Sequence, residues 1–470
     1  MACRKPRQGW LWHMCLGNAL LASLLRPVSL AATPSPLPSP APLAAQLKQQ
    51  QQRVQSSSGA AAPSCIFNIQ GSGNMTSPQI LSAAIDCQPG SRGANVTVVG
   101  GSLLQPFSDR FTGVNYQLLW DLGPSAAIIV RSQSLAITNS NFSGILGWAP
   151  AALSIIDSSV LISNTTFQQN AGGQAGAIFI NGSSSVDVEG SVLANNNGSQ
   201  SGAIFLNGPS TLSINGSVLA SNAGALGGGV GLINGSFFAV SNTHLLGNTA
   251  QNGGAVFLSN CTDSVLSGNM YGSNTATVQG GALYAEKCGG DYMDNTYIAN
   301  GAQRAGAVYF TNAKYCLFQG ETFTNNSAVG DTSGLQMTNA YGNVDSCTFT
   351  GNNGQKGSAI FQNTCIGNII NSMFEDNQAS TSGGAIFRAG ACRGNVTGCV
   401  FLQNTAEQLA GAVYDDQTVG SIQNSTFSRN DAQQTNTASS IFRNQCSGSI
   451  SNCKGLGRGD VLEQGVSRSP

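Results

Sequence analysis

The sequence predicts an all-β fold, a single-stranded parallel β-helix in which each coil takes about 26 residues and three short strands. Two observations predict it. A short motif, of which MFEDNQASTSGGAIFR at 373–388 is one copy, recurs along the chain at a nearly constant spacing. Within each copy the apolar residues alternate with a period of two, which is typical of strands, and Gly and Asn interrupt every copy. A solenoid of helices is therefore not expected.

The composition indicates a folded protein with few charges. Of 470 residues, 41% are hydrophobic and 9% are Asp, Glu, Lys or Arg, whereas charged residues make up about 25% of typical globular domains. The formal net charge is −1, so a basic surface for nucleic acid is not expected. The hydrophobic content is too high for a chain that is disordered throughout.

Residues 1–31 are predicted to be a signal peptide. Arg4, Lys5 and Arg7 precede the apolar run GWLWHMCLGNALLASLL, and small residues follow near Ala31. A transit peptide is the alternative, because acidic residues are absent from this segment. No later run of about 20 apolar residues occurs, so no transmembrane helix is expected after the signal is cleaved.

The rest of the chain is predicted to divide into four segments. The first is a disordered linker rich in Pro, Ser and Gln. The second is a cap with a short helix that starts at Ser77 and Pro78 in SPQILSAAIDC, a favourable N-cap and first-turn pair. The predicted bounds are 32–62 for the linker, 63–96 for the N-terminal cap, 97–456 for the β-helix and 457–470 for a disordered tail.

An Asn marks the register of the repeat and stands 25 to 27 residues from the next one along eleven copies. A sharp turn out of a strand needs a left-handed backbone, which Asn tolerates, so we expect the Asn at that turn. In coils stacked about 4.8 Å apart, each side-chain amide can hydrogen-bond to the next one. The predicted Asn ladder consists of Asn170, Asn196, Asn222, Asn248, Asn274, Asn300, Asn326, Asn352, Asn377, Asn404 and Asn430.

Two apolar positions in each copy are expected to point into the core. One is aliphatic in all eleven copies, as at Ile178, and follows small residues that permit a tight turn. The other is a large apolar residue three positions before the Asn, as at Phe167. These positions define two strands, and intervening segments such as SVDVEGS supply the third.

The paired motifs Gly-Gly-Ala-Ile and Phe-x-x-Asn resemble the repeats of polymorphic outer membrane proteins, from about Thr166 to Phe442. The resemblance implies a right-handed β-helix of the pectin-lyase-like fold. It also implies a place in the cell envelope or outer membrane, usually with a role in adhesion. Those proteins end in a large C-terminal β-barrel that anchors and exports them. No segment of that size follows Phe442 in this sequence, so export by that route is not expected.

No catalytic, cofactor or metal site is expected, although the same fold carries enzymes that cleave polysaccharides. Asp415 and Asp416 form the one Asp-Asp pair, and because no His is near them in sequence we interpret them as a solvated strand end. His244 is expected to be exposed on a strand. Arg388 and Arg443 share the coil position of Asp415, which predicts ion pairs between coils.

The cysteines favour an exported protein. Cys261 and Cys288 occupy the same coil position one coil apart, and Cys365 and Cys392 match that pattern with an offset of one residue, so both pairs could form disulfides. Local bridges between cysteines seven residues apart are the alternative, and an odd number of cysteines remains after loss of the signal. The candidates, with a first pair in the cap, are Cys65, Cys87, Cys261, Cys288, Cys365, Cys392, Cys399, Cys446 and Cys453.

Twelve Asn-x-Ser/Thr sequons occur, which predicts a glycoprotein of the secretory route. About eight would arise by chance from the Asn, Ser and Thr content, so the excess is mild. The sequons include Asn164, Asn181, Asn215, Asn234, Asn260 and Asn395.

An aromatic residue follows the inward aliphatic one in nine of the eleven copies, and alternation along the strand turns it outward. Two interpretations are open. The row is a stacked ladder, bare or covered by a loop, that stiffens the rod, or it is an apolar stripe that binds a glycan or a partner protein. The candidate binding residues are Phe361, Phe387, Tyr414, Phe179, Phe205, Phe257, Tyr284, Tyr309 and Phe442.

Together these patterns predict a secreted, non-catalytic β-helix that is a structural or adhesive component of a cell wall, envelope or extracellular matrix. The alternative is a polysaccharide lyase or glycoside hydrolase of the same fold. The expected partner is a glycan or a cell-surface protein, not nucleic acid. The expected location is outside the cell, on its surface or in its wall.

Overall fold

The computed structural model of the protein describes residues 84–86, 95–102, 128–131, 134–145, 151–434 and 438–465. The chain divides into two units, Met1–Ala61 and Ala62–Pro470, and every described residue belongs to the second. The predicted signal peptide and linker, and the Cys65–Cys87 pair, lie outside the described residues. All elements of the described part are strands, and none of its segments is a helix of the length and apolarity needed to cross a membrane.

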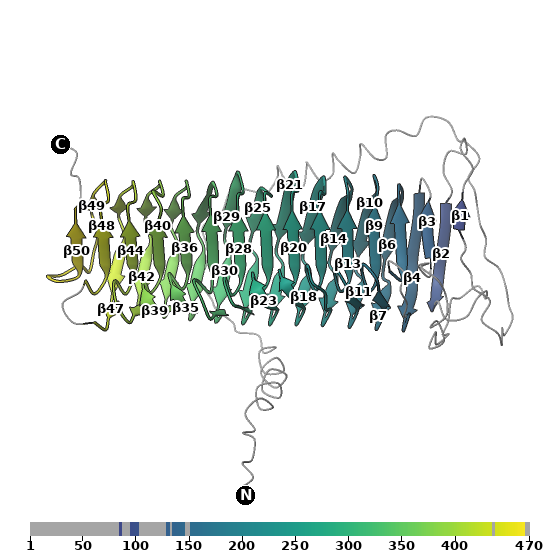
Figure 1. Ribbon diagram of the computed structural model, residues 1–470, viewed down its shortest axis with the longest axis horizontal. Coiled ribbons are helices and arrows are strands. Elements are labelled where there is room, and N and C mark those ends of the chain that lie inside the picture. Colours follow the sequence, from purple (N-terminus) through teal and green to yellow (C-terminus); the bar gives the residue numbers. More distant parts are fainter. Residues whose placement is uncertain are drawn as a thin grey trace, which may run out of the picture. The chain divides into compact units, whose positions relative to one another are not determined.

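One coil shows how the chain winds. Strand β9 (Ile178–Asn181) leads through a turn to β10 (Ser185–Glu189), then to β11 (Val192–Ala194) and the short β12 (Asn197–Gly198). The chain then begins the next coil at β13 (Ile204–Asn207), which pairs in parallel with β9. Figure 1 shows these coils stacked side by side along one axis. The three predicted strands are confirmed, and the segment after the Asn adds a short fourth one.

The strands stack into three groups of parallel sheets. Sheet A, with 15 strands, contains the strand that starts each coil. Besides β9 and β13 it comprises β1 (Ala84–Asp86), β3 (Ile128–Arg131), β5 (Leu153–Ile156), β16 (Val230–Ile233), β20 (Val256–Ser259), β24 (Leu283–Glu286), β28 (Val308–Thr311), β32 (Leu335–Thr338), β36 (Ile360–Asn363), β40 (Ile386–Ala389), β44 (Val413–Asp416), β48 (Ile441–Asn444) and β50 (Val461–Gln464).

Sheet B, with 25 strands, receives two strands from most coils. The strands equivalent to β10 are β2 (Asn95–Ser102), β4 (Ser134–Ser143), β6 (Ser159–Ser163), β14 (Thr211–Asn215), β17 (Phe237–Ser241), β21 (Asp263–Ser267), β25 (Gly290–Met293), β29 (Cys316–Gln319), β33 (Gly342–Asp345), β37 (Ile369–Ile370), β41 (Val396–Thr397), β45 (Ile422–Gln423) and β49 (Ile450–Ser451). Those equivalent to β11 are β7 (Thr166–Gln168), β15 (Val218–Ala220), β18 (His244–Leu246), β22 (Met270–Gly272), β26 (Thr296–Ile298), β30 (Thr322–Thr324), β34 (Thr348–Thr350), β38 (Met373–Glu375), β42 (Val400–Leu402) and β46 (Thr426–Ser428).

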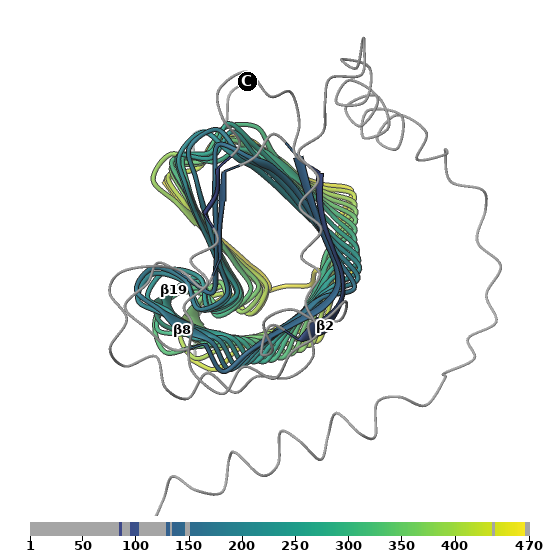
Figure 2. The ribbon, with the colours of Figure 1, turned by 90° about the vertical axis from the view of Figure 1, so that its right-hand side faces the viewer.

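Sheet C is built from the short strands that follow each ladder Asn, and it has eight strands. In the view along the solenoid these strands, labelled at β19, lie on a lobe beside the main coil (Figure 2). They are β19 (Thr249–Asn252), β23 (Thr275–Gln279), β27 (Gly301–Ala302), β31 (Ser327–Ala328), β35 (Asn353–Lys356), β39 (Gln378–Ser382), β43 (Thr405–Ala406) and β47 (Asp431–Ala432). A separate two-stranded pair, β8 (Ala171–Gly172) with β12, continues the series.

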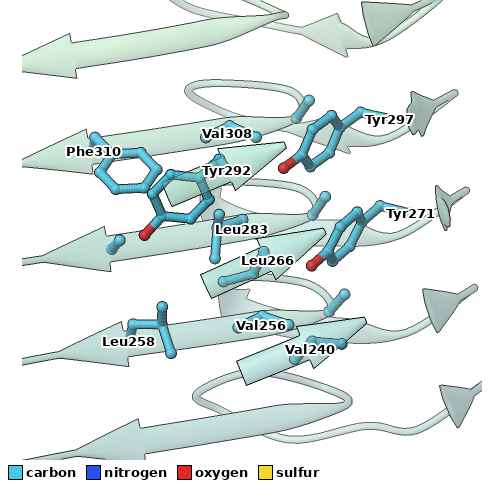
Figure 3. Packing of buried hydrophobic residues seen from close by; sticks show 14 of the residues in the cluster. Val240, Val256, Leu258, Leu266, Tyr271, Leu283, Tyr292, Tyr297, Val308 and Phe310 are labelled. Atoms are coloured by element: carbon cyan, nitrogen blue, oxygen red, sulfur yellow. The ribbon is translucent and has the colours of Figure 1, made fainter. Parts of the chain in front are cut away.

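The core fills the inside of the coil, as the period of two predicts. All eleven aliphatic positions are fully buried, and they stack in register, as Val256, Leu283 and Val308 do (Figure 3). The large residue three positions before each ladder Asn is buried too. Where consecutive copies carry aromatic rings, the rings stack, with centroids 4.8 Å apart for Tyr271 and Tyr297. Such columns bury apolar area on every coil, which is the main force that holds coils together.

The predicted Asn ladder is confirmed in its hydrogen bonds. The Nδ2 of Asn248 donates to Oδ1 of Asn274 at 3.1 Å and to the Leu219 carbonyl at 2.9 Å, and its backbone N–H donates to the same Oδ1 at 2.9 Å. The ladder residues from Asn170 to Asn404 repeat this arrangement, Asn430 accepts the last bond of the series, and all are buried. Each amide therefore satisfies buried backbone groups of two coils, which a buried site requires.

The left-handed backbone conformation was expected at the ladder Asn, and this prediction is wrong by one residue. The left-handed conformation belongs to the residue before it, such as Asn195 (φ 55°) or Ser221 (φ 54°). That preceding residue points out to solvent or sits at the surface, so several residue types accept the turn. The ladder position itself requires an amide because its side chain faces inward and must both donate and accept hydrogen bonds.

Both ends of the predicted β-helix also need correction. The expected cap helix would include Ala84–Asp86, but these residues form β1, which pairs with β3 in sheet A. At the other end, β50 pairs with β48 and extends sheet A into the segment predicted as a disordered tail. Its Val461 packs against the core, which explains why the chain makes this further strand.

We expect Asn248→Ala to lower the free energy of unfolding by roughly 1–3 kcal/mol, because it leaves the Leu219 carbonyl and the Asn222 amide of the neighbouring coil without their partner. Urea unfolding followed by circular dichroism measures the change. Gln251→Ala, at an exposed position of the same coil, is the control and should be close to wild type. Equal stability of the two variants would contradict a structural role for the ladder.

Candidate functional site

A surface groove follows the turns between sheets A and B in the coils that begin with β28 to β40. Successive turns expose Tyr315, Tyr341, Ile366 and Arg393, and parallel bridges pair Tyr341 with Ile366 and Ile366 with Arg393. The apolar side chains are unusually bare, with 86% of Tyr315, 42% of Tyr341 and 45% of Ile366 exposed. These residues form one wall of the groove, which has a volume of about 570 Å³.

The floor of the groove is a column of glycines. Gly342, Gly367 and Gly394 each follow a wall residue, and a Cβ on any of them would collide with the backbone of the preceding coil. Gly367 and Gly394 also have φ values of 155° and 141°, which L side chains rarely adopt. Because the floor has no side chains, a ligand can approach the backbone closely.

The opposite wall comes from the outer face of sheet B and the residue before β37, and it is polar except for Leu317. Asp291, Leu317, Asn343 and Asn368 line it. The Oδ1 of Asn343 accepts the Asn368 N–H at 2.8 Å, and the Oδ1 of Asn368 accepts the Asn395 N–H at 2.8 Å. The amide oxygens are thus used, and the NH₂ groups of the exposed Asn343 and the half-buried Asn368 can donate to water or to a ligand. Aromatic faces on one side and donors on the other suit a ligand rich in hydroxyl groups.

The predicted aromatic row has a different environment from the groove. Its rings do point away from the main core, but Phe205, Phe257, Tyr309 and Phe442 are at most 8% exposed, and the other five are half-buried. Neighbouring rings stack, with centroids 4.5 Å apart for Phe387 and Tyr414. The remaining stacked pairs are Phe179–Phe205, Phe257–Tyr284, Tyr284–Tyr309, Phe361–Phe387 and Tyr414–Phe442.

The segments that connect sheet C to sheet A cover this row. Ala175 packs with Phe205, and Ala410 and Ala438 pack with Phe442. The rings point outward from sheet A, as predicted, and the neighbouring lobe of sheet C packs on them, which agrees with the interpretation of a covered ladder. A binding role for these rings remains a prediction, and the stacking and burial favour the packing interpretation.

The predicted ion pairs between coils are confirmed, and they lie inside the solenoid. Arg388 makes two hydrogen bonds of 2.7 Å to the Asp415 carboxylate, Arg443 stands 3.9 Å from it, and Arg443 pairs with Glu463 at 3.0 Å. Arg388, Asp415 and Arg443 are at most 1% exposed. The interpretation of Asp415 as part of a solvated strand end is wrong, because the residue after the aromatic one faces the core. His244 is exposed on β18, as expected.

A second buried polar column stands at the turns between the two strands of sheet B. Here each side-chain oxygen accepts the backbone N–H of the preceding coil, as in Asn269 to Asn295 at 3.0 Å. Glu321 takes this place in one coil, and its Oε1 accepts both the N–H and the Nδ2 of Asn295 at 3.0 and 2.9 Å. Its Oε2 has no hydrogen bond of good geometry. Burial raises the pKa of Glu321 to about 8, against the opposing effect of these hydrogen bonds.

Of the two predicted cross-coil pairs, one is bonded, whereas Cys365 and Cys392 are free thiols. Cys261 and Cys288 form a disulfide between adjacent coils, as predicted. Cys392 and Cys399 do not form the alternative local bridge, since Cys392 lies at the turn from sheet A to sheet B and Cys399 at the turn inside sheet B. The pair seven residues apart at 446–453 is separated in the same way, and both thiols are free. No three side chains of His, Cys, Asp or Glu gather around a common point among the described residues.

Comparison with known families gives one match. A family model described as a right handed beta helix region matches residues 125–278. The match agrees with the observed solenoid, and the coils that form the groove lie after it. No curated protein and no solved structure matched the chain.

The groove is not among the sites that the sequence predicted. Its signal was the glycine that recurs two residues after the buried Cys or Ala of the turn, as Gly367 after Cys365 and Gly342 after Ala340. The wall residues between them share no type, because Tyr, Ile and Arg all occupy that position. Periodicity alone therefore could not show that they form one surface.

We expect the free energy of unfolding to fall as the pH rises from about 4.5 to about 8, because folding raises the pKa of Glu321 from 4.5 to about 8. The folded state then binds a proton that the unfolded chain has lost, so this contribution is complete below pH 4.5 and is lost toward pH 8. Glu321→Gln keeps an oxygen for Asn295 and should be more stable than wild type above pH 8 by roughly 1–3 kcal/mol.

Urea unfolding at pH 5 and pH 9 measures this difference. Glu189→Gln, at an exposed position, is the matched control and should follow the wild-type profile. Parallel pH profiles for Glu321→Gln and wild type would contradict the assignment of a buried, protonated carboxyl group.

Proposed function

We propose that the protein is a secreted, non-catalytic β-helix that serves as an adhesive or structural element of a cell wall, envelope or extracellular matrix. The observation that carries the proposal is the groove, where Tyr315 and Tyr341 are exposed in adjacent coils beside a floor of glycines. In this proposal the groove binds a glycan of the matrix along the axis of the solenoid.

The chemistry of the groove supports a glycan ligand. Sugar rings carry apolar C–H faces that pack on Tyr315 and Tyr341, and each aromatic contact contributes about 0.5–1.5 kcal/mol beyond the area that it buries. Hydroxyl groups can bond to the amides of Asn343 and Asn368 and to Arg393. A polymer that contacts several coils adds these small contributions together, and the constant spacing of the coils suits a repeating ligand.

The rest of the molecule supports a structural role. Stacked amides, stacked rings and a cross-coil disulfide stiffen successive coils. The resemblance to repeats of polymorphic outer membrane proteins, and the predicted signal peptide, support a place at the cell surface. The carboxylate of Asp415 is held by two buried Arg side chains, which supports a structural use of that pair.

Binding to immobilised polysaccharides tests the proposal. We expect Tyr315→Ala/Tyr341→Ala to weaken binding by roughly fivefold to a hundredfold, since two ring contacts of the size given above amount to about 1–3 kcal/mol. Val329→Ala removes an equally exposed apolar side chain outside the groove and should bind like wild type.

Unchanged binding by the double variant would contradict the role of the groove. The same polymers, among them polygalacturonate and alginate, are then incubated with wild type and Ca²⁺. Formation of unsaturated or reducing ends at enzymatic rates would overturn the non-catalytic proposal and support a polysaccharide lyase or hydrolase.

A further inference from the structure

Two pairs of cysteines occupy equivalent places in the solenoid. Cys261 and Cys288 lie at the turn from sheet A to sheet B, and each directly follows a left-handed residue, Asn260 (φ 55°) or Lys287 (φ 52°). They stand 27 residues apart in sequence and are joined as a disulfide. In this bonded pair, the backbone N–H of Cys261 points at Sγ of Cys288 at 3.0 Å.

Cys365 and Cys392 repeat this geometry four coils later. They are also 27 residues apart, and each directly follows a left-handed residue, Thr364 (φ 56°) or Ala391 (φ 61°). The backbone N–H of Cys365 points at Sγ of Cys392 at 3.2 Å, which is the same contact as in the bonded pair. Both cysteines are buried free thiols.

Other cysteines are less suited to bridge this pair. Cys446 stands at the same turn two coils after Cys392, and Thr418 lies between them with its hydroxyl 3.3 Å from the Cys446 sulfur. Coils two apart are separated by about 9.6 Å, beyond the reach of a disulfide. Cys399 lies on the next turn of its coil, as shown above. Cys365 and Cys392 are therefore each other's nearest partners in the geometry.

The surroundings of Cys392 favour its thiolate. The hydrogen bond from the Cys365 thiol, with a smaller contribution from the Arg388 guanidinium, lowers the pKa of Cys392 to about 7, although burial acts in the opposite direction. The same contact raises the pKa of the Cys365 thiol.

We propose that Cys365 and Cys392 are a second cross-coil redox site, which closes to a disulfide by exchange with a small-molecule disulfide such as oxidised glutathione. The Cys392 thiolate attacks one sulfur of the reagent, releases one glutathione thiolate and forms a mixed disulfide. Cys365 loses its proton and attacks the Cys392 sulfur, which releases the second glutathione. Two protein thiols are oxidised, and one glutathione disulfide is reduced to two thiols. Since both sulfurs are buried in the folded protein, the exchange takes place while the coil is still open.

The bond would fix the wall of the groove. Ile366 and Arg393 directly follow the two cysteines and are paired by a backbone bridge. A disulfide below them holds these two coils at a set spacing, as Cys261–Cys288 does for its own coils. Formation of the Cys365–Cys392 disulfide does not depend on glycan binding in the groove, so the two proposals are tested by separate experiments.

Peptide mapping tests the proposal directly. The full chain is refolded with oxidised and reduced glutathione, alkylated while denatured and without reduction, and digested with trypsin. Cleavage after Lys356, Arg388 and Arg393 places the two cysteines in separate peptides, 357–388 and 389–393. We expect these peptides to be found linked, and the Cys399 peptide, 394–429, to be alkylated. Cys392→Ser should leave peptide 357–388 alkylated, and Cys399→Ser should keep the link.

Detection of both peptides in alkylated form, while Cys261 and Cys288 are bridged in the same sample, would overturn the proposal, as would a link from 389–393 to another cysteine. A melting experiment adds a second readout in the Cys261→Ser/Cys288→Ser background. There, dithiothreitol should lower the melting temperature by roughly 2–5 °C, because reduction frees a loop of this length in the unfolded chain. The effect should disappear when Cys392→Ser is added, and a persisting effect would count against this bond.

Discussion

The structure depends on one constraint, the backbone hydrogen bonds that join each coil to the next with a nearly constant offset. The ladder bonds between equivalent residues span 26 positions in most coils and 25 or 27 in the others. Once this offset is set, every residue stands directly over its equivalent in the coil below. Each side chain therefore belongs to a column of equivalent residues, and its hydrogen bonds and packing depend on its neighbours in that column.

Columns explain how a solenoid with so few charged residues can bury polar ones. Asn amides satisfy each other and the backbone of two coils, and the Arg388–Asp415–Arg443 column alternates in charge, so that each carboxylate or guanidinium faces an opposite charge. Glu321 is the exception, because its neighbours Asn295 and Cys347 carry no charge and burial keeps it protonated near neutral pH. Columns also form at the surface. There, equivalent residues of successive turns lie above one another and together make the wall and floor of the groove.

The sequence was sufficient for the columns that every coil repeats. The spacing of the Asn residues, the inward aliphatic position, the Cys261–Cys288 pair and the Arg–Asp–Arg alternation follow from the offset alone. Features that depend on what lies beside a column were not accessible. Whether the aromatic row is bare or covered stayed open, since no pattern revealed that the lobe of sheet C covers Phe205 or Phe442. The groove was missed because its wall, from Tyr315 to Arg393, changes residue type in every coil.

Deletion of one complete coil tests the central claim most directly. Removal of residues 223–248 joins Asn222 to Thr249 and keeps every column in register, whereas removal of residues 223–235 shifts each later column to another face of the coil. The account predicts that the first variant keeps its β-sheet circular dichroism spectrum and melts cooperatively, while the second loses both. Equal tolerance of the two deletions, or unfolding of the whole-coil variant, would contradict the dependence of the fold on a constant coil-to-coil offset.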